Sequence, residues 1–323
     1  MFDAQKRRLV WLLMAFMGGI ALTTAVFAVA RCSNANYPLI NPMTPCIARD
    51  AREAVTFTVF QKTLERWMDE YAAEYGVTES AVYFRDLQNG PTFGINDHIL
   101  FSPSSLLKVP VMIAVFREAE REPTILEQEI EIKGAMLNPS QDIEPEKTVI
   151  DGHTYTVAEL VEKMIVNSDN RSKDILRRLL ILRTSQEDPL FETLQDAGMA
   201  TEDYREDDFL SVKTYAAFFR MLYHATFLNR EMSNAALELL TRTTFTQGLV
   251  AGLPLKTTAA HKFGIRDNNI TKDLYQLHDC GIIYHPRRAY MLCIMTRGTD
   301  LDQMARFIAK ISSMVYAEVD IKY

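Results

Sequence analysis

Ser105 and Lys108 have the types and the spacing of a nucleophile and its base. They lie in the stretch 101–110, FSPSSLLKVP, and no other serine in the chain has a lysine three residues later. A serine hydroxyl becomes a good nucleophile when a nearby base removes its proton. A lysine amine can be that base if burial or a neighbouring cation lowers its pKa. Ser104 is a favourable N-cap, so the sequence predicts Ser105 in a first helical turn, on the same face as Lys108.

Two later motifs could supply partners for this pair. Ser168-Asp169-Asn170 falls between two predicted helices, where its simplest interpretation is a helix cap. Lys262-Phe263-Gly264 falls on a predicted strand, where Lys262 could instead be solvated. We interpret His261, next to Lys262, as a packed or edge histidine and not as a base, because the lysines already fill that role.

Hydrophobic periodicity and turn residues predict the elements that must position these motifs. Helices are predicted at 51–75, 104–119, 156–167, 171–182, 190–198, 211–228, 233–243 and 304–315, and strands at 81–85, 92–95, 257–265, 280–284 and 289–295. Residues 120–155 are polar and predicted to be irregular. This order predicts an α+β fold, in which N- and C-terminal helices flank an antiparallel five-stranded sheet and an all-helical lobe is inserted.

Cys280 and Cys293 fall on the last two predicted strands. If His285 faces Arg288 in the connecting turn, the two cysteines face each other directly. They would then be either two apolar core thiols or, less often, a cross-strand disulfide.

The N-terminus has the pattern of a membrane anchor. Residues 1–8 form a basic tip, and the uncharged apolar run 9–30 is long enough to cross a bilayer as a helix. The positive charges at 6–8 predict a cytoplasmic N-terminus, with the main domain outside the cell membrane. Cleavage of a signal peptide after Ala30 is the alternative, and the domain would then be secreted. We interpret residues 31–50 as a Pro-rich linker and residues 51–323 as the main domain. The linker contains Cys32 and Cys46, which could pair in an oxidising compartment.

Composition excludes some partners. A net charge of -7 argues against general nucleic-acid binding, which requires a basic face. The four cysteines and six histidines show no metal-ligand spacing, so we expect neither a metal nor a cofactor. The oligomeric state is left open.

The three motifs, in this order and on these elements, resemble those of the penicillin-recognising serine enzymes, closest to the class A β-lactamase branch of the β-lactamase/transpeptidase-like fold. The resemblance covers residues 52–318. It implies that Ser105 attacks an acyl carbon, that Lys108 takes its proton and that Ser168 relays a proton to the leaving nitrogen. It also implies substrate contacts and an oxyanion hole formed by the Ser105 and Ile265 backbone N–H groups; the substrate-binding residues would be Asn170, Lys262, Gly264 and Ile265.

The chain departs from that pattern at two places. Phe263 replaces the Thr or Ser whose hydroxyl helps to bind a substrate carboxylate, and a phenyl ring donates no hydrogen bond. The segment 200–210 lacks the Glu-x-x-x-Asn that activates the deacylating water; its acidic residues are Glu202, Asp203, Glu206, Asp207 and Asp208. We interpret it as a solvated acidic loop, although one of these carboxylates could be a base.

The sequence therefore predicts a membrane-anchored extracytoplasmic serine hydrolase or acyltransferase that forms an acyl-enzyme at Ser105 and deacylates slowly. The expected substrate is a β-lactam or a peptidoglycan-peptide-like amide. The alternative is a catalytically degenerate member of the same fold that binds a cell-envelope partner without turnover.

Overall fold

The computed structural model describes residues 37–42, 56–88, 90–134, 148–184, 187–198, 207–267 and 274–323. The predicted membrane segment 9–30, Cys32 and Cys46 lie outside these residues. Within the described ranges, no helix combines the length and the apolar character needed to cross a bilayer.

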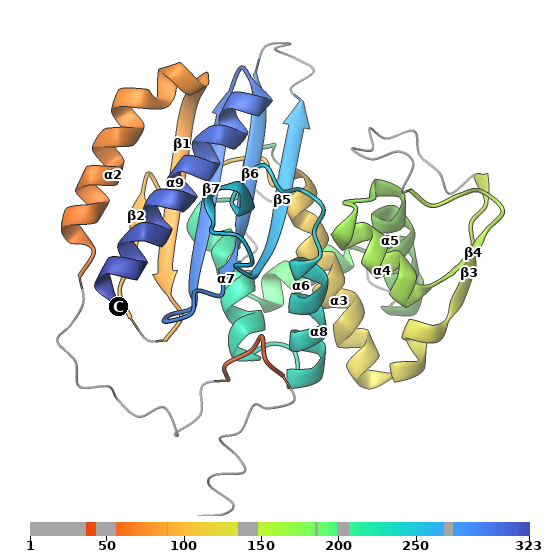
Figure 1. Cartoon of the computed structure of the whole chain (residues 1–323). Coiled ribbons are helices and arrows are strands. Elements are labelled where there is room, and N and C mark those ends of the chain that lie inside the picture. The colour runs from red at the N-terminus through yellow and green to blue at the C-terminus, as the bar shows by residue number, and fades with distance from the viewer. Residues whose placement is uncertain are drawn as a thin grey trace, which may run out of the picture.

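A five-stranded antiparallel sheet is the centre of the fold (Figure 1). The strand order is β2-β1-β7-β6-β5, so β5 forms one edge. The strands are β1 (Val77–Asp86), β2 (Thr92–Ile95), β5 (Ala259–Asp267), β6 (Tyr275–Ile283) and β7 (Tyr290–Gly298). The predicted α+β class and the five predicted strands are confirmed, although β1 and β6 begin several residues earlier than the sequence indicated.

Helices cover both faces of the sheet. Among the described helices, the first, α2 (Thr58–Tyr71), and the last, α9 (Leu301–Lys322), lie next to each other on one face (Figure 1). The predicted helical lobe contains α3 (Lys108–Arg121), α4 (Val157–Val166), α5 (Asn170–Thr184), α6 (Pro189–Asp196), α7 (Val212–His224) and α8 (Arg230–Thr241). Short 3-10 helices complete the described helices: η1 (Ala72–Tyr75), η2 (Ser104–Leu107), η3 (Pro123–Glu127) and η6 (Val250–Gly252).

Strand β7 shows how the sheet separates two hydrophobic cores. Leu292 and Ile294 are buried in the core shared with α2 and α9. Met291, Cys293 and Met295 alternate with them and are buried in the core shared with the helical lobe. Because side chains alternate along a strand, a strand buried on both faces becomes an almost continuous apolar run.

Cys280 and Cys293 are directly paired in the β6–β7 register, as the sequence predicted. The structure joins them by a disulfide bond, the less favoured of the two alternatives that the sequence left open. Both cysteines are fully buried.

Two segments predicted to be irregular carry structure. Residues 120–155, interpreted as irregular, contain η3 and a small antiparallel sheet of β3 (Glu129–Glu131) and β4 (Thr154–Thr156). Residues 37–42, part of the predicted linker, pack against the domain. Ile40 is buried, the Asn41 N–H donates to the Tyr223 carbonyl at 2.7 Å, and the Tyr284 hydroxyl donates to the Leu39 carbonyl at 2.9 Å. Buried apolar surface and paired backbone groups explain why this part of the linker is ordered.

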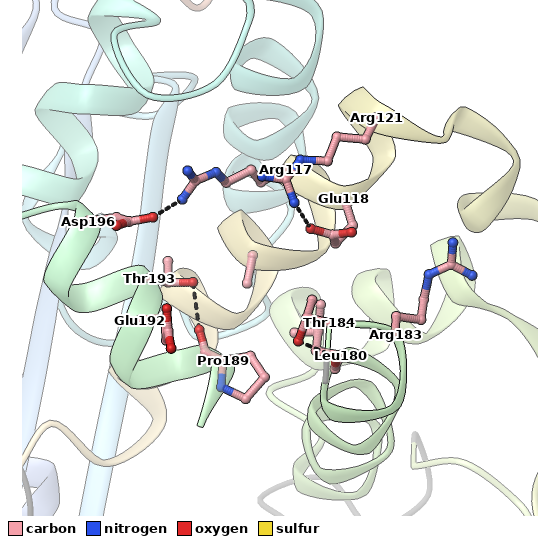
Figure 2. A pocket seen from close by; sticks show the side chains of 11 residues that line it. Arg117, Glu118, Arg121, Leu180, Arg183, Thr184, Pro189, Glu192, Thr193 and Asp196 are labelled. Atoms are coloured by element: carbon pink, nitrogen blue, oxygen red, sulfur yellow. Dashed lines mark hydrogen bonds and ion pairs between the residues drawn. The ribbon is translucent and has the colours of Figure 1, made fainter. Parts of the chain in front are cut away.

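A polar cavity of about 250 Å³ lies in the helical lobe, between α3, α5 and α6 (Figure 2). Its arginines are paired with carboxylates: Arg117 with Asp196, Arg121 with Glu118, and Arg183 with Glu122. None of the predicted site residues lines it.

Candidate active site

Ser105 lies in a 3-10 turn and not in the first turn of an α-helix. The turn is η2, and α3 begins only at Lys108. The predicted N-cap, Ser104, makes no capping bond; it has a positive φ of 48°, and its hydroxyl donates to the Ile265 carbonyl instead. In a 3-10 helix, side chains three residues apart eclipse one another. The turn therefore places Lys108 directly beside Ser105, which remains partly exposed.

The Lys108 amine lies at the centre of the site. Its side chain is fully buried, and Nζ lies 2.8 Å from Ser105 Oγ. Nζ also lies 2.6 Å from the Ser168 carbonyl, 3.0 Å from Ser168 Oγ and 2.8 Å from Asn170 Oδ1. The carbonyl and the amide oxygen can only accept, so they occupy two N–H groups. A neutral amine then keeps one lone pair for a hydroxyl proton, which is the geometry that a general base for Ser105 requires.

The residues between α4 and α5 both cap α5 and contact Lys108. Asp169 is buried and caps α5, because its carboxylate accepts the backbone N–H of Ser172 at 3.0 Å. Ser168 has a positive φ of 59°, a conformation that costs a non-glycine residue free energy. With Asp169 as the cap, Ser168 and Asn170 on either side of it both contact Lys108. The capping interpretation of this motif therefore holds for Asp169, whereas its neighbours reach the candidate site.

Lys262 extends the cluster from the sheet edge. Its Nζ atom lies 2.9 Å from Ser168 Oγ, so Ser168 contacts the amines of both lysines. Burial lowers the pKa of Lys262 well below its ordinary value; the nearby Lys108 lowers it further, and the Asp279 carboxylate opposes the shift. The alternative of a solvated lysine is wrong, because Lys262 has no exposed surface. The sequence-predicted residues Ser105, Lys108, Ser168 and Lys262 thus form one continuous chain of contacts.

The ring of Phe263 lies against the Lys262 amine. The distance from Lys262 Nζ to the ring centroid is 4.0 Å, and Nζ also donates to the Phe263 carbonyl at 3.1 Å. The ring also stacks on Phe245, at a centroid distance of 4.4 Å. Phe263 is 2% exposed.

Gly264 and Ile265 hold the sheet edge close to the Ser105 turn. A Cβ atom on Gly264 would lie 3.1 Å from both Leu106 Cγ and the Pro103 carbonyl oxygen, so any larger residue would force one of these neighbours to shift. The Ser104 hydroxyl fixes the Ile265 carbonyl at the same turn. This proximity brings the backbone of β5 beside Ser105, as the predicted oxyanion hole needs.

Tyr215 is a site-positioning residue that the sequence did not indicate. It is fully buried on α7, and its hydroxyl donates to the Leu106 carbonyl at 3.0 Å. In an α-helix that carbonyl would accept from residue 110, but Pro110 has no N–H group. Tyr215 thus satisfies the acceptor that Pro110 leaves without its usual donor, and it supports the Ser105 turn. The two residues are 109 positions apart, so no local sequence signal could have found the pair.

His261 is packed, as predicted. It is buried, and its Nδ1 atom lies 2.8 Å from the buried Asp279 carboxylate, which also accepts the Leu249 N–H at 2.9 Å. Asp279 is a buried negative charge close to Lys262 that the sequence analysis missed.

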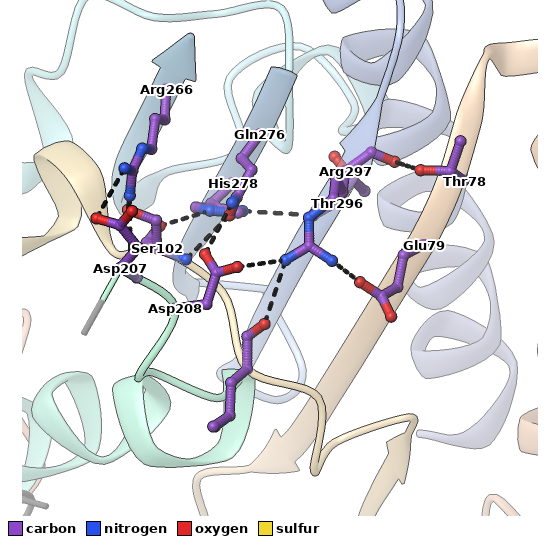
Figure 3. A network of polar contacts seen from close by, with 11 residues as sticks. Thr78, Glu79, Ser102, Asp207, Asp208, Arg266, Gln276, His278, Thr296 and Arg297 are labelled. Carbon is purple, nitrogen blue, oxygen red and sulfur yellow. Dashed lines mark hydrogen bonds and ion pairs between the residues drawn. The ribbon is translucent and has the colours of Figure 1, made fainter. Parts of the chain in front are cut away.

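Asp207 and Asp208, the described aspartates of the acidic segment, form ion pairs with arginines (Figure 3). Asp207 forms an ion pair with Arg266 at 2.9 Å, and Asp208 forms one with Arg297 at 2.9 Å. Asp207 is nevertheless 74% exposed, whereas Asp208 is 39% exposed. The interpretation as a solvated loop therefore holds for Asp207 and is incomplete for Asp208; Glu202, Asp203 and Glu206 lie outside the described residues.

The same network fixes the chain just before the Ser105 turn (Figure 3). Ser102 donates its N–H to Gln276 at 2.9 Å, and its hydroxyl accepts from Arg266 at 2.6 Å. Burial lowers the pKa of His278 to about 4, so its ring is neutral at pH 7. Because His278 Nε2 lies 2.9 Å from the Ser102 carbonyl, this nitrogen carries the proton.

Comparison with known proteins agrees with this architecture. A family model described as "Beta-lactamase enzyme family" matches residues 60–319. A β-lactamase of Bacteroides uniformis is 28% identical over 242 residues, which are 70% of this chain and 82% of that protein.

Solved structures show the same fold at lower identity. The TLA-1 extended-spectrum β-lactamase is similar with a TM-score of 0.69 and 18% identity, over 80% of this chain and 98% of that one. A class A β-lactamase from Bacteroides cellulosilyticus is similar with a TM-score of 0.68 and 20% identity, over 80% of this chain and 98% of that one. A mutant of PBP-A in an acyl-enzyme complex with penicillin G is similar with a TM-score of 0.66 and 19% identity, over 80% of this chain and 97% of that one. The chain belongs to the β-lactamase enzyme family and is a serine hydrolase of that α+β fold.

Proposed function

We propose that Ser105 forms a covalent acyl-enzyme with an amide or β-lactam carbonyl, and that the acyl group is released slowly. The observation that supports the first half is the 2.8 Å contact between Lys108 Nζ and Ser105 Oγ, at an amine with no exposed surface. Lys108 takes the Ser105 proton as the hydroxyl attacks. The proton passes through Ser168 to the leaving atom, because Ser168 Oγ lies 3.0 Å from Lys108 Nζ. The N–H groups of Ser105 and Ile265 stabilise the oxyanion, and Asn170 contacts the substrate amide.

We infer slow release of the acyl group from the contacts of the acidic segment 200–210. Of its carboxylates, the described Asp207 and Asp208 are engaged by Arg266 and Arg297. A paired carboxylate is a weak base for activating water. Since no other base is assigned among the residues that the structure describes, we expect the acyl-enzyme to persist, which suits a penicillin-binding peptidase or a covalent sensor.

The test is a burst measurement with a thioester that has a neutral leaving thiol. We expect thiol release equal to the amount of enzyme, followed by a much slower steady phase, with neither phase in Ser105→Ala. Thiol release that is linear from the start, without a burst, would contradict slow deacylation. If wild type and Ser105→Ala both release no thiol, the alternative stands: a degenerate member of the family that binds a cell-envelope partner without turnover.

We also propose that residues 9–30 anchor the chain in the cell membrane with the domain outside. The uncharged run after Lys6, Arg7 and Arg8 supports this orientation. Alkaline extraction of membranes carrying the full chain is the test. The anchored protein stays in the pellet, and a deletion of residues 1–30 is the control that does not. A full chain released by the extraction, with its mature N-terminus after Ala30, would show that a cleaved signal is correct.

A further inference from the structure

The Lys262 ammonium has three N–H groups, and protein atoms offer three partners for them. It contacts Ser168 Oγ at 2.9 Å, the Phe263 carbonyl at 3.1 Å and the Phe263 ring at 4.0 Å. A cation over an aromatic face is attracted by the electron density of the ring, and more strongly when water is excluded. Lys262 has no exposed surface, so water is excluded here.

Phe263 is held in this position from two sides. Its backbone is fixed in the β5–β6 register opposite Asp279. Its ring stacks on Phe245 at a centroid distance of 4.4 Å and an interplanar angle of 20°. To approach the Lys262 ammonium from the side of the ring, a substrate anion would have to break the stack and replace the ring.

The other basic groups described beside the Ser105 turn are also engaged. Lys108 contacts the Ser168 carbonyl and Asn170 in addition to Ser105. Arg266, the residue after Ile265, donates to Ser102 Oγ and is paired with Asp207. A carboxylate placed here would lose its hydration without gaining a cation of its own, which is costly.

We propose that Phe263 closes the anion subsite next to Ser105, and that the enzyme selects acyl donors whose leaving group carries no carboxylate. The substrate class is then an ester, or an amide whose departing side is neutral; within the proposed function this excludes β-lactams and peptides whose leaving side carries a carboxylate. This inference rests on the proposed function, and it changes the role expected for Lys262, which serves Ser168 and not a substrate carboxylate.

The reaction is otherwise the ordinary acyl transfer. Ser105 Oγ forms a bond to the acyl carbon, and the bond from that carbon to the leaving oxygen, nitrogen or sulfur breaks with its electron pair. The Ser105 proton moves through Lys108 and Ser168 to the leaving atom. Atoms and electrons balance without any further reactant.

Two thioesters with the same hippuryl group make the test. One releases thioglycolate, which carries a carboxylate, and the other releases thioglycolamide, which is neutral. We expect the wild type to be acylated about tenfold or more faster by the neutral donor, on the scale at which a mismatched polar group is rejected. Phe263→Thr removes the ring and supplies a hydroxyl, and it should remove or reverse that preference.

Each preference is a ratio measured on one protein sample, so partial loss of folded Phe263→Thr does not affect it. Phe245→Leu is the intermediate variant: it removes the stacking partner but leaves the Phe263 ring, so it should reduce the preference for the neutral donor by less than Phe263→Thr does. A wild type that reacts faster with the carboxylate donor, or an unchanged ratio in Phe263→Thr, would overturn the inference. Fluorophosphonate labelling of Ser105, run in parallel, separates the two claims. Labelling with a carboxylate preference overturns only this inference, whereas no labelling overturns the proposed function and this inference with it.

Discussion

The Tyr215 hydroxyl donates to the Leu106 carbonyl, the acceptor that Pro110 leaves without a helical donor. This bond joins η2, the turn that carries Ser105, to α7 across the lobe core. It also lies one residue after Ser105, so it acts on the position of the nucleophile.

Tyr215→Phe should therefore lower both stability and the acylation rate. The buried Leu106 carbonyl would lose the Tyr215 hydrogen bond and keep the Lys108 backbone N–H, at a cost of about 1 kcal/mol in the free energy of unfolding. Urea unfolding measures the first effect, and the burst rate with the neutral thioester measures the second. Tyr155→Phe is the matched control, because that hydroxyl accepts an exposed backbone N–H, from Ile150, at 3.3 Å. An equal loss of burst rate in both variants would show that Tyr215 has no special role.

Lys262→Met should reveal a pH-dependent contribution to stability. The pKa of Lys262 is lowered on folding from its ordinary value of 10.5. Between the lowered pKa and 10.5 the unfolded chain binds the extra proton, so the contribution of Lys262 to stability rises with pH. Methionine does not titrate. The unfolding free energy of the wild type relative to Lys262→Met should therefore increase as the pH is raised from neutral towards 10.5.

Urea midpoints of the two proteins at several pH values check this. Lys256→Met, at an exposed loop position, is the comparison for a lysine without burial. A difference between wild type and Lys262→Met that stays constant with pH would contradict the lowered pKa of the buried Lys262 amine.

The Cys280–Cys293 disulfide should stabilise the sheet. It closes a loop with a sequence separation of 13, for which loop entropy suggests about 3 kcal/mol. The double variant Cys280→Ala/Cys293→Ala should lose that amount in denaturant unfolding. Because the chain has four cysteines, Cys32→Ala/Cys46→Ala separates this pair from the other two. If the Cys280/Cys293 variant kept the stability of the wild type, the disulfide would contribute nothing.

Local patterns predicted most of the fold. The capping box at Thr156 and Glu159 is present, and it starts α4 where the sequence indicated. The facing of Cys280 and Cys293 followed from the turn alone. The linker around Ile40 was misjudged, because proline-rich composition says nothing about a distant surface that can receive one apolar side chain.

The sequence indicated the residues of the candidate site but not the geometry that the structure gives them. Motif order indicated Ser105, Lys108, Ser168 and Lys262, and the structure brings them into contact. The 3-10 turn, and the positive φ angles of Ser104 and Ser168, depend on tertiary contacts that override local propensity. For the same reason the sequence left open whether the Phe263 side chain lies in the site or away from it.

The central claim is that Ser105, activated by Lys108, becomes covalently acylated. Intact-protein mass spectrometry after mixing with the neutral hippuryl thioester, followed by peptide mapping, tests it directly. The account predicts one hippuryl group on Ser105, none in Ser105→Ala, and acylation slowed by about a hundredfold or more in Lys108→Met, the scale of a lost general base. Ser104→Ala, one residue away, should still be acylated at Ser105. Unmodified protein in the presence of thiol release, or a hippuryl group on any other residue, would contradict the account.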